Sequence, residues 1–125
     1  MKEITVVFKE PCGEPKIISI PANLASLQKC VEGDIEAASP SEELARRGIV
    51  AYINDEGKLC GKLPNLWAFE KQDILVGNVL FVGTDEEGGD ISLTDEDIVK
   101  VMEYCDSMKL TESEFIRYMA FMMNH

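Results

Sequence analysis

Histidine is nearly absent from this chain of 125 residues, because its only histidine is the last residue, His125. Ser-His and Cys-His catalysis both need a base beside the nucleophile, and terminal residues are usually frayed. The sequence therefore predicts a protein that is not an enzyme. Cys30, which follows a lysine, is expected to be a small core residue rather than a nucleophile.

Metal and phosphate motifs are also missing. The four cysteines are spread along the chain without a CxxC pair, so no zinc site is expected. The acidic run at residues 85–90 offers oxygen ligands, but it lacks the glycine and glutamate that a calcium loop places at its sixth and twelfth positions. The glycines form neither GxGxxG nor GxxxxGK. We therefore expect no metal and no cofactor.

Long apolar runs are absent too. None approaches the roughly 20 residues of a membrane-spanning helix. The opening residues MKEITVVFKEP alternate and carry charge, unlike a signal peptide. We therefore expect a cytoplasmic protein with reduced cysteines. The length and the apolar fraction of 46% are typical of one globular domain with its own core.

Basic residues are scarce, and the charge is uneven. The chain has 12 Lys and Arg against 23 Asp and Glu, a net charge of −11. Residues 85–125 hold 11 of the acids and 3 of the bases, a net of −8, which leaves −3 for residues 1–84. Such a surface repels nucleic acid and anionic membranes. It attracts a basic protein surface, including one that normally holds DNA.

The N-terminal part predicts a hairpin, a helix and a short strand. The segments Ile4–Phe8 and Lys16–Ile20 flank a Pro-Cys-Gly-Glu-Pro turn, a pattern typical of an antiparallel hairpin. Asn23 is a favourable N-cap for a helix over Leu24–Val31. A short strand over Ile35–Ala38 is expected to follow.

A second hairpin is predicted over Ile49–Asn65. Its first strand alternates apolar residues, and Gly57 tolerates the positive φ of a tight turn. Leu59 and Leu63 are expected to return toward the core before a proline ends the pairing. Asn65–Phe69 is interpreted as a cap and a short helical turn.

Two helices are predicted at the C-terminal end, Asp95–Met108 and Glu112–Met123. Each begins with a capping box, in which a threonine N-cap is paired with an acid three residues later: Thr94 with Asp97, and Thr111 with Glu114. Acids in the first turn suit the positive end of the helix dipole. Five of the six methionines lie in these helices, which suits an adaptable partner surface, a homodimer interface or packing on the sheet.

Together these elements predict an α+β fold. The continuous apolar run at residues 79–82 indicates a strand buried on both faces. We expect a small, mostly antiparallel sheet with one short packed helix and two C-terminal helices. Residues 1–90 are predicted to form the α+β core, and residues 91–125 a two-helix extension packed on the same domain.

Four motifs resemble a known family: LQKCVEGDIE at 27–36, AYINDEGKLCGKLPN at 51–65, DILVGNVLFVG at 73–83 and LTDEDI at 93–98. In this order they resemble the family of domains of unknown function numbered 3846, which occurs in phage and mobile-element genes of bacteria. The matching positions are Gln28, Gly33, Ile35, Glu36, Asn54, Gly57, Lys58, Pro64, Asn65, Gly77 and Gly83. The chain departs from the pattern at Glu32-Gly33-Asp34, where the family usually has two glycines, and at Asn78, where it often has glycine. The resemblance implies kinship and habitat, and it implies no activity.

The first functional hypothesis is a non-catalytic interaction protein with an acidic partner surface. Its residues would be Asp95, Glu96, Glu103, Asp106, Glu112 and Glu114. They would bind the basic surface of a nucleic-acid-binding enzyme, as a DNA mimic that inhibits a host defence nuclease of restriction or CRISPR type. The ordinary alternative is that these acids cap helices and keep the protein soluble.

The second hypothesis is a small-ligand-binding or enzymatic pocket made by polar residues of the family motifs, Glu36, Asn54, Lys58 and Asn65. It requires these four side chains to meet. The ordinary alternative is that Asn54 and Asn65 bond to turn and cap backbone. In that case Glu36 and Lys58 would form a cross-strand pair.

Overall fold

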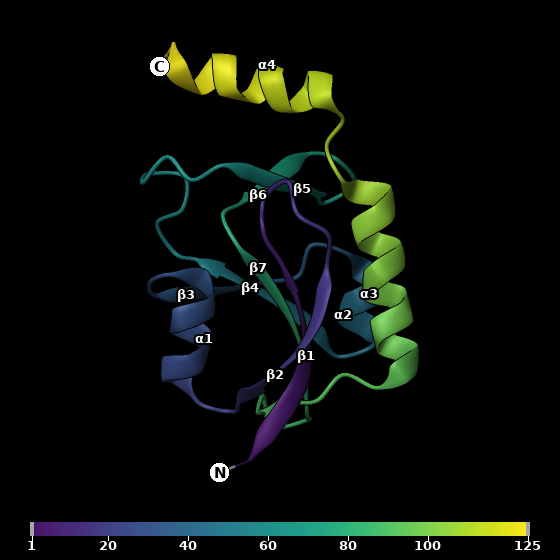
Figure 1. Cartoon of the computed structure of the whole chain (residues 1–125). Coiled ribbons are helices and arrows are strands. Elements are labelled where there is room, and N and C mark those ends of the chain that lie inside the picture. The colour runs from purple at the N-terminus through teal and green to yellow at the C-terminus, as the bar shows by residue number, and fades with distance from the viewer. Residues whose placement is uncertain (1, 125) are drawn as a thin grey trace.

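A central six-stranded antiparallel sheet lies between two layers in the computed structural model, which describes residues 2–124 (Figure 1). His125 lies outside the described residues. The elements in chain order are β1 (Glu3–Lys9), β2 (Lys16–Pro21), α1 (Leu24–Val31), β3 (Ile35–Ala38), α2 (Glu42–Arg46), β4 (Ile49–Asn54), β5 (Pro64–Ala68), β6 (Asp73–Val76), β7 (Val79–Thr84), β8 (Asp90–Ile91), α3 (Asp95–Met108) and α4 (Glu112–Met123). The fold is α+β, as predicted.

The main sheet has the order β2-β1-β7-β4-β3, and β8 pairs with one end of β7. Strands β5 and β6 form a separate two-stranded sheet. The predicted first hairpin is confirmed, since β1 pairs with β2 from Glu3 opposite Pro21 to Phe8 opposite Lys16. The predicted first helix is confirmed as well, because the Asn23 side chain accepts a hydrogen bond from the Ser26 amide at 2.8 Å.

Strand β7 separates two hydrophobic cores, so the prediction of a strand buried on both faces is confirmed. Val79 and Phe81 point into the core beneath α3. Leu80 and Val82 point into the core on the opposite face, beside Leu27 of α1. All four β7 side chains are fully buried. In Figure 1, α1 covers one face of the sheet, while α2 and α3 cover the other.

The predicted second hairpin is wrong. Strand β4 pairs with β3 on one edge and β7 on the other, so neither edge is left for a returning strand. Residues 55–61 form successive turns instead, and Leu59 is 89% exposed. Leu63 is 43% exposed and does not return to the core. The polar segment after β4 has little apolar surface to bury, whereas residues 79–82 of β7 are all apolar.

The helical turn predicted at Asn65–Phe69 is also wrong, because these residues belong to β5 and its following turn. Pro64 begins a strand here, a position at which its missing N–H is tolerated. Leu66 and Ala68 then alternate into the core, and β5 pairs antiparallel with β6. A Pro-Asn pair is typical of a turn, and the alternation over residues 64–68 is too short to indicate a strand from the sequence alone.

The two predicted C-terminal helices are confirmed with the predicted bounds and both capping boxes. Helix α3 packs on the sheet through Val101, Tyr104 and Cys105, which are buried. The Tyr104 hydroxyl donates to the Trp67 carbonyl at 2.5 Å, which joins α3 to β5. No helix in residues 2–124 is long and apolar enough to cross a membrane.

Helix α4 is held far more loosely than α3. It has no fully buried residue, and Ile116 and Met123 are 57% and 82% exposed. In Figure 1 it leaves the end of α3 and crosses over the β5–β6 sheet. The connection is fixed by a backbone bridge between Lys109 and Leu66. The apolar side chains of this helix are therefore only partly covered.

We expect a chain ending at Leu110, without α4, to fold and to lose only about 1–2 kcal/mol of unfolding free energy, because α4 contributes only half-buried side chains. A chain ending at Ser92 also lacks α3 and should not fold, since the core beneath α3 becomes exposed. Circular dichroism during urea titration measures both. Loss of cooperative unfolding in the longer chain would contradict the expectation.

Candidate functional site: an acidic groove and a buried lysine

A groove with a volume of about 750 Å³ lies between α2, α3 and the turn that joins β5 to β6. Its walls carry four glutamates and one lysine, with an aromatic ring on either side; these residues are Glu42, Glu43, Glu70, Glu103, Lys100, Phe69 and Tyr104. The excess of carboxylates makes the groove acidic. A ligand that carries positive charge is therefore favoured there.

The β5–β6 turn that forms one wall has an unusual backbone. Phe69, Glu70 and Lys71 all have positive φ, at 53°, 57° and 68°, a region that residues other than glycine seldom adopt. The Phe69 amide donates to the Pro40 carbonyl at 2.9 Å, which ties the turn to the segment before α2. The surrounding structure thus holds this wall in one conformation.

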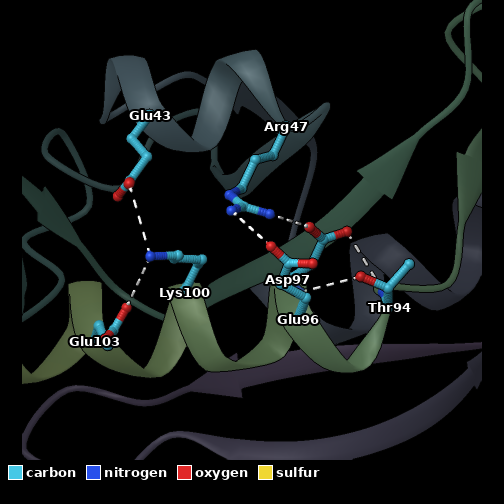
Figure 2. Close-up of polar contacts among 7 residues, drawn as sticks. All are labelled: Glu43, Arg47, Thr94, Glu96, Asp97, Lys100 and Glu103. Carbon is cyan, nitrogen blue, oxygen red and sulfur yellow. Dashed lines mark hydrogen bonds and ion pairs between the residues drawn. The ribbon is translucent and has the colours of Figure 1, made fainter.

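An ion-pair network joins α2 to α3, and the part of it around Lys100 lines the groove (Figure 2). Arg47, at the end of α2, donates to Glu96 at 3.0 Å and to Asp97 at 3.5 Å. The hydrogen bond that Arg47 donates to the Glu96 carboxylate raises the pKa of the Arg47 guanidinium. Lys100 lies between Glu43, at 4.0 Å, and Glu103, at 3.5 Å. Four carboxylates face two cations in this network, so negative charge remains in excess.

The four predicted partner-binding acids of α3 all lie on its exposed surface. Glu96 and Glu103 belong to the network with α2. Asp106 pairs with Lys109 at 3.5 Å, and both side chains are strongly exposed. Asp95 lies in the first turn of the helix. Exposed pairs of this kind contribute about 0–1 kcal/mol each, so a partner's cations can replace them at little cost.

The two predicted acids of α4 lie beyond the groove. Glu112 is exposed in the first turn. Glu114 accepts a hydrogen bond from the Thr111 amide at 2.8 Å, as the capping box requires. That bond lowers the pKa of the Glu114 carboxyl, and the nearby Trp67 indole lowers it further. The indole Nε1 is buried and forms no hydrogen bond of good geometry. Glu114 is therefore a capping residue.

The four residues of the second hypothesis do not meet. Glu36, Asn54 and Lys58 line one hollow of about 230 Å³, whereas Asn65 lines another. Lys58 Nζ bonds to Asp73 at 2.6 Å. Asn54 donates to the Val31 carbonyl at 3.1 Å, and its oxygen accepts from the Glu56 amide at 2.8 Å. The Asn54 side chain thereby joins the end of α1 to the turn after β4.

Asn65 instead meets Lys9, a residue that the sequence reasoning missed. Lys9 Nζ donates to Asn65 Oδ1 at 2.8 Å, and Asn65 Nδ2 donates to the carbonyls of Lys9 and Gly77, both at 2.8 Å. Lys9 is only 5% exposed. The alternation of β1 could have predicted the burial of Lys9. Lys9 lies on the same face of the strand as Val7, and α3 covers that face.

Burial lowers the pKa of Lys9 from its usual value of 10.5. In the unfolded chain the lysine binds a proton until higher pH, so the folded protein gains stability as pH rises toward 10.5. We therefore expect the stability difference between wild type and Lys9→Met to shift in favour of wild type between pH 7 and pH 10. Urea unfolding at several pH values measures it; an unchanged difference would contradict the expectation.

The fold and these sites define an α+β domain with an acidic helical face and a buried lysine–asparagine pair. Residues 2–106 match the family described as "Domain of unknown function (DUF3846)". The chain belongs to this family. The match extends from β1 into α3, and α4 lies beyond it. Comparison with curated proteins and with solved structures gave no match.

Proposed function

We propose that this protein is a non-catalytic interaction protein of a phage or mobile element that binds the basic surface of a nucleic-acid-binding enzyme in the bacterial cytoplasm. The enzyme would be a host defence nuclease of restriction or CRISPR type, inhibited because the protein's carboxylates take the place of DNA phosphates. The observation that carries the proposal is the exposed acidic face of α3, together with the groove beside it, where glutamates outnumber lysines.

The length of α3 supports this reading. A helix of 14 residues is about 21 Å long, and its exposed acids extend from Asp95 in the first turn to Asp106 in the last. One turn of duplex DNA is about 34 Å long. The acidic face can therefore occupy a substantial part of a groove that normally holds DNA. Such complementarity mainly increases the association rate, and salt weakens it.

The test is a charge reversal that spares the capping residues. In the variant Asp95→Lys, Glu103→Lys, Asp106→Lys, Asp97 and Glu114 remain to cap α3 and α4. DNA cleavage by a panel of purified restriction and CRISPR nucleases is measured with each protein. We expect wild type to inhibit at least one of them in a salt-sensitive way, and the variant to be about 100-fold weaker, because repulsion replaces attraction.

The matched control carries the same change of charge elsewhere, as Glu36→Lys, Asp55→Lys, Glu56→Lys. All three positions are exposed, and this variant should inhibit nearly as well as wild type. Equal inhibition by the α3 variant, or no inhibition of any nuclease by wild type, would contradict the proposal. If only the control variant lost inhibition, the hollow at Glu36, Asn54 and Lys58 would be the binding site.

A further inference from the structure

Lys9 is a buried amine that forms no ion pair within residues 2–124. Its two hydrogen bonds go to neutral oxygens, Asn65 Oδ1 at 2.8 Å and the Glu10 carbonyl at 3.0 Å. Burial of an unpaired ammonium is costly. Desolvation therefore lowers the pKa of Lys9, although Cys105, Cys12 and Glu14 oppose the shift. The neutral amine is accordingly favoured more here than on the surface.

A hollow of about 400 Å³ reaches this amine. The β1–β2 turn, β5, α3 and the start of α4 form its walls, and its side chains include Glu14, Asn65, Cys105 and Phe115. The volume lies within the range of about 300–1,000 Å³ that is typical of small-molecule sites. None of the acidic groove's glutamates lines this hollow, although Asp106 of the acidic face of α3 does.

The hydrogen bonds of Lys9 suit a nucleophile. A neutral amine has two N–H groups, and the two oxygens accept both. The lone pair then remains for reaction. Buried lysines with lowered pKa are the ones that form Schiff bases with carbonyl compounds.

We propose that Lys9 forms an imine with a small aldehyde or ketone bound in this hollow. The Nζ lone pair attacks the carbonyl carbon and forms a C–N bond. The carbonyl oxygen then leaves as water with the two amine protons, and no oxidant or reductant takes part. When the imine is protonated, its single N–H can still bond to Asn65 Oδ1. This activity is independent of the acidic groove.

Propanal with cyanoborohydride tests the proposal, because the hydride reduces each imine to a stable propyl-lysine. The folded full-length chain is treated briefly at pH 7, digested and mapped by mass spectrometry. Lys16, whose side chain is 64% exposed, is the internal reference. We expect Lys9 to react severalfold faster than Lys16, because the lowered pKa of Lys9 leaves more of its amine neutral at pH 7.

Two controls test whether the fast reaction of Lys9 depends on its environment in the folded protein. In urea the preference for Lys9 should disappear, because unfolding removes its environment. The folded variant Lys9→Arg should lose the fast reaction while Lys16 reacts at the wild-type rate; if that variant does not fold, the urea comparison alone decides. The proposal fails if Lys9 reacts no faster than Lys16 in the folded protein, or if its advantage persists in urea. Binding of propanal without a reducible bond also overturns it.

Discussion

Replacement of Asn65 with alanine is expected to lower the free energy of unfolding by about 3–5 kcal/mol. The side chain is 3% exposed, and its three hydrogen bonds serve the Lys9 ammonium or amine and the carbonyls of Lys9 and Gly77. Alanine leaves all three groups buried without this partner. Each such loss costs about 1–3 kcal/mol. Two of the three groups belong to Lys9 and one to Gly77, so Asn65 joins two segments that lie far apart in the chain.

The matched control for Asn65→Ala is Asn78→Ala. Asn78 is half-buried and forms one hydrogen bond, from Nδ2 to the Cys30 carbonyl at 3.0 Å, so a loss of about 1 kcal/mol is expected. Urea unfolding followed by circular dichroism measures both variants. If Asn65→Ala were as stable as the control, the hydrogen bonds between Asn65 and Lys9 would not hold β1 to β5. A ligand role would then be the better explanation of Asn65.

The second large effect is expected for Phe81→Ala, a loss of about 3–5 kcal/mol. Phe81 is fully buried at the centre of β7, and its ring meets that of Tyr104 edge to face at a centroid distance of 6.0 Å. β1 pairs with β7 at Val7, and β4 pairs with it at Ala51. Because both edges of the strand are held, the backbone cannot move to fill the cavity.

Ile17→Ala on β2 is the control for Phe81→Ala, because Ile17 is also an apolar strand residue but is 55% exposed. A loss below about 1 kcal/mol is expected there. Thermal and urea unfolding compare the two. A small loss for Phe81→Ala would mean that α3 does not pack on this face as the structure has it. The partly covered α4 should be unaffected in either variant.

The elements that could be predicted from the sequence are those whose cause is local. Asn23 and the two threonine capping boxes act on amides three residues away, so the starts of α1, α3 and α4 were predictable. The β1–β2 hairpin closes over a short turn, and its strands need no third partner to set their register. The apolar run at residues 79–82 predicted that β7 would be buried on both faces. The fold class followed from these elements together.

The candidate sites were predictable only in part, because side chains meet across the fold. The acids at 95, 96, 103 and 106 lie on α3, and Lys100 of the same helix pairs with Glu103 locally, but Arg47 and Glu43 join this network only because α2 packs beside α3. The proposed meeting of Asn65 with Asn54 did not occur. Their strands, β5 and β4, belong to different sheets.

By itself the sequence determined α1, α3 and α4, the first hairpin, the buried central strand and the acidic character of the C-terminal third, whereas α2 was not predicted. The reason is that capping, alternation and charge act over a few residues. The tertiary structure alone decided the partners of β4, the strand at Pro64 and the burial of Lys9. Each of these depends on which distant segment offers more apolar surface or covers a given face. β7 pairs with one edge of β4, and α3 covers the face of β1 that carries Lys9.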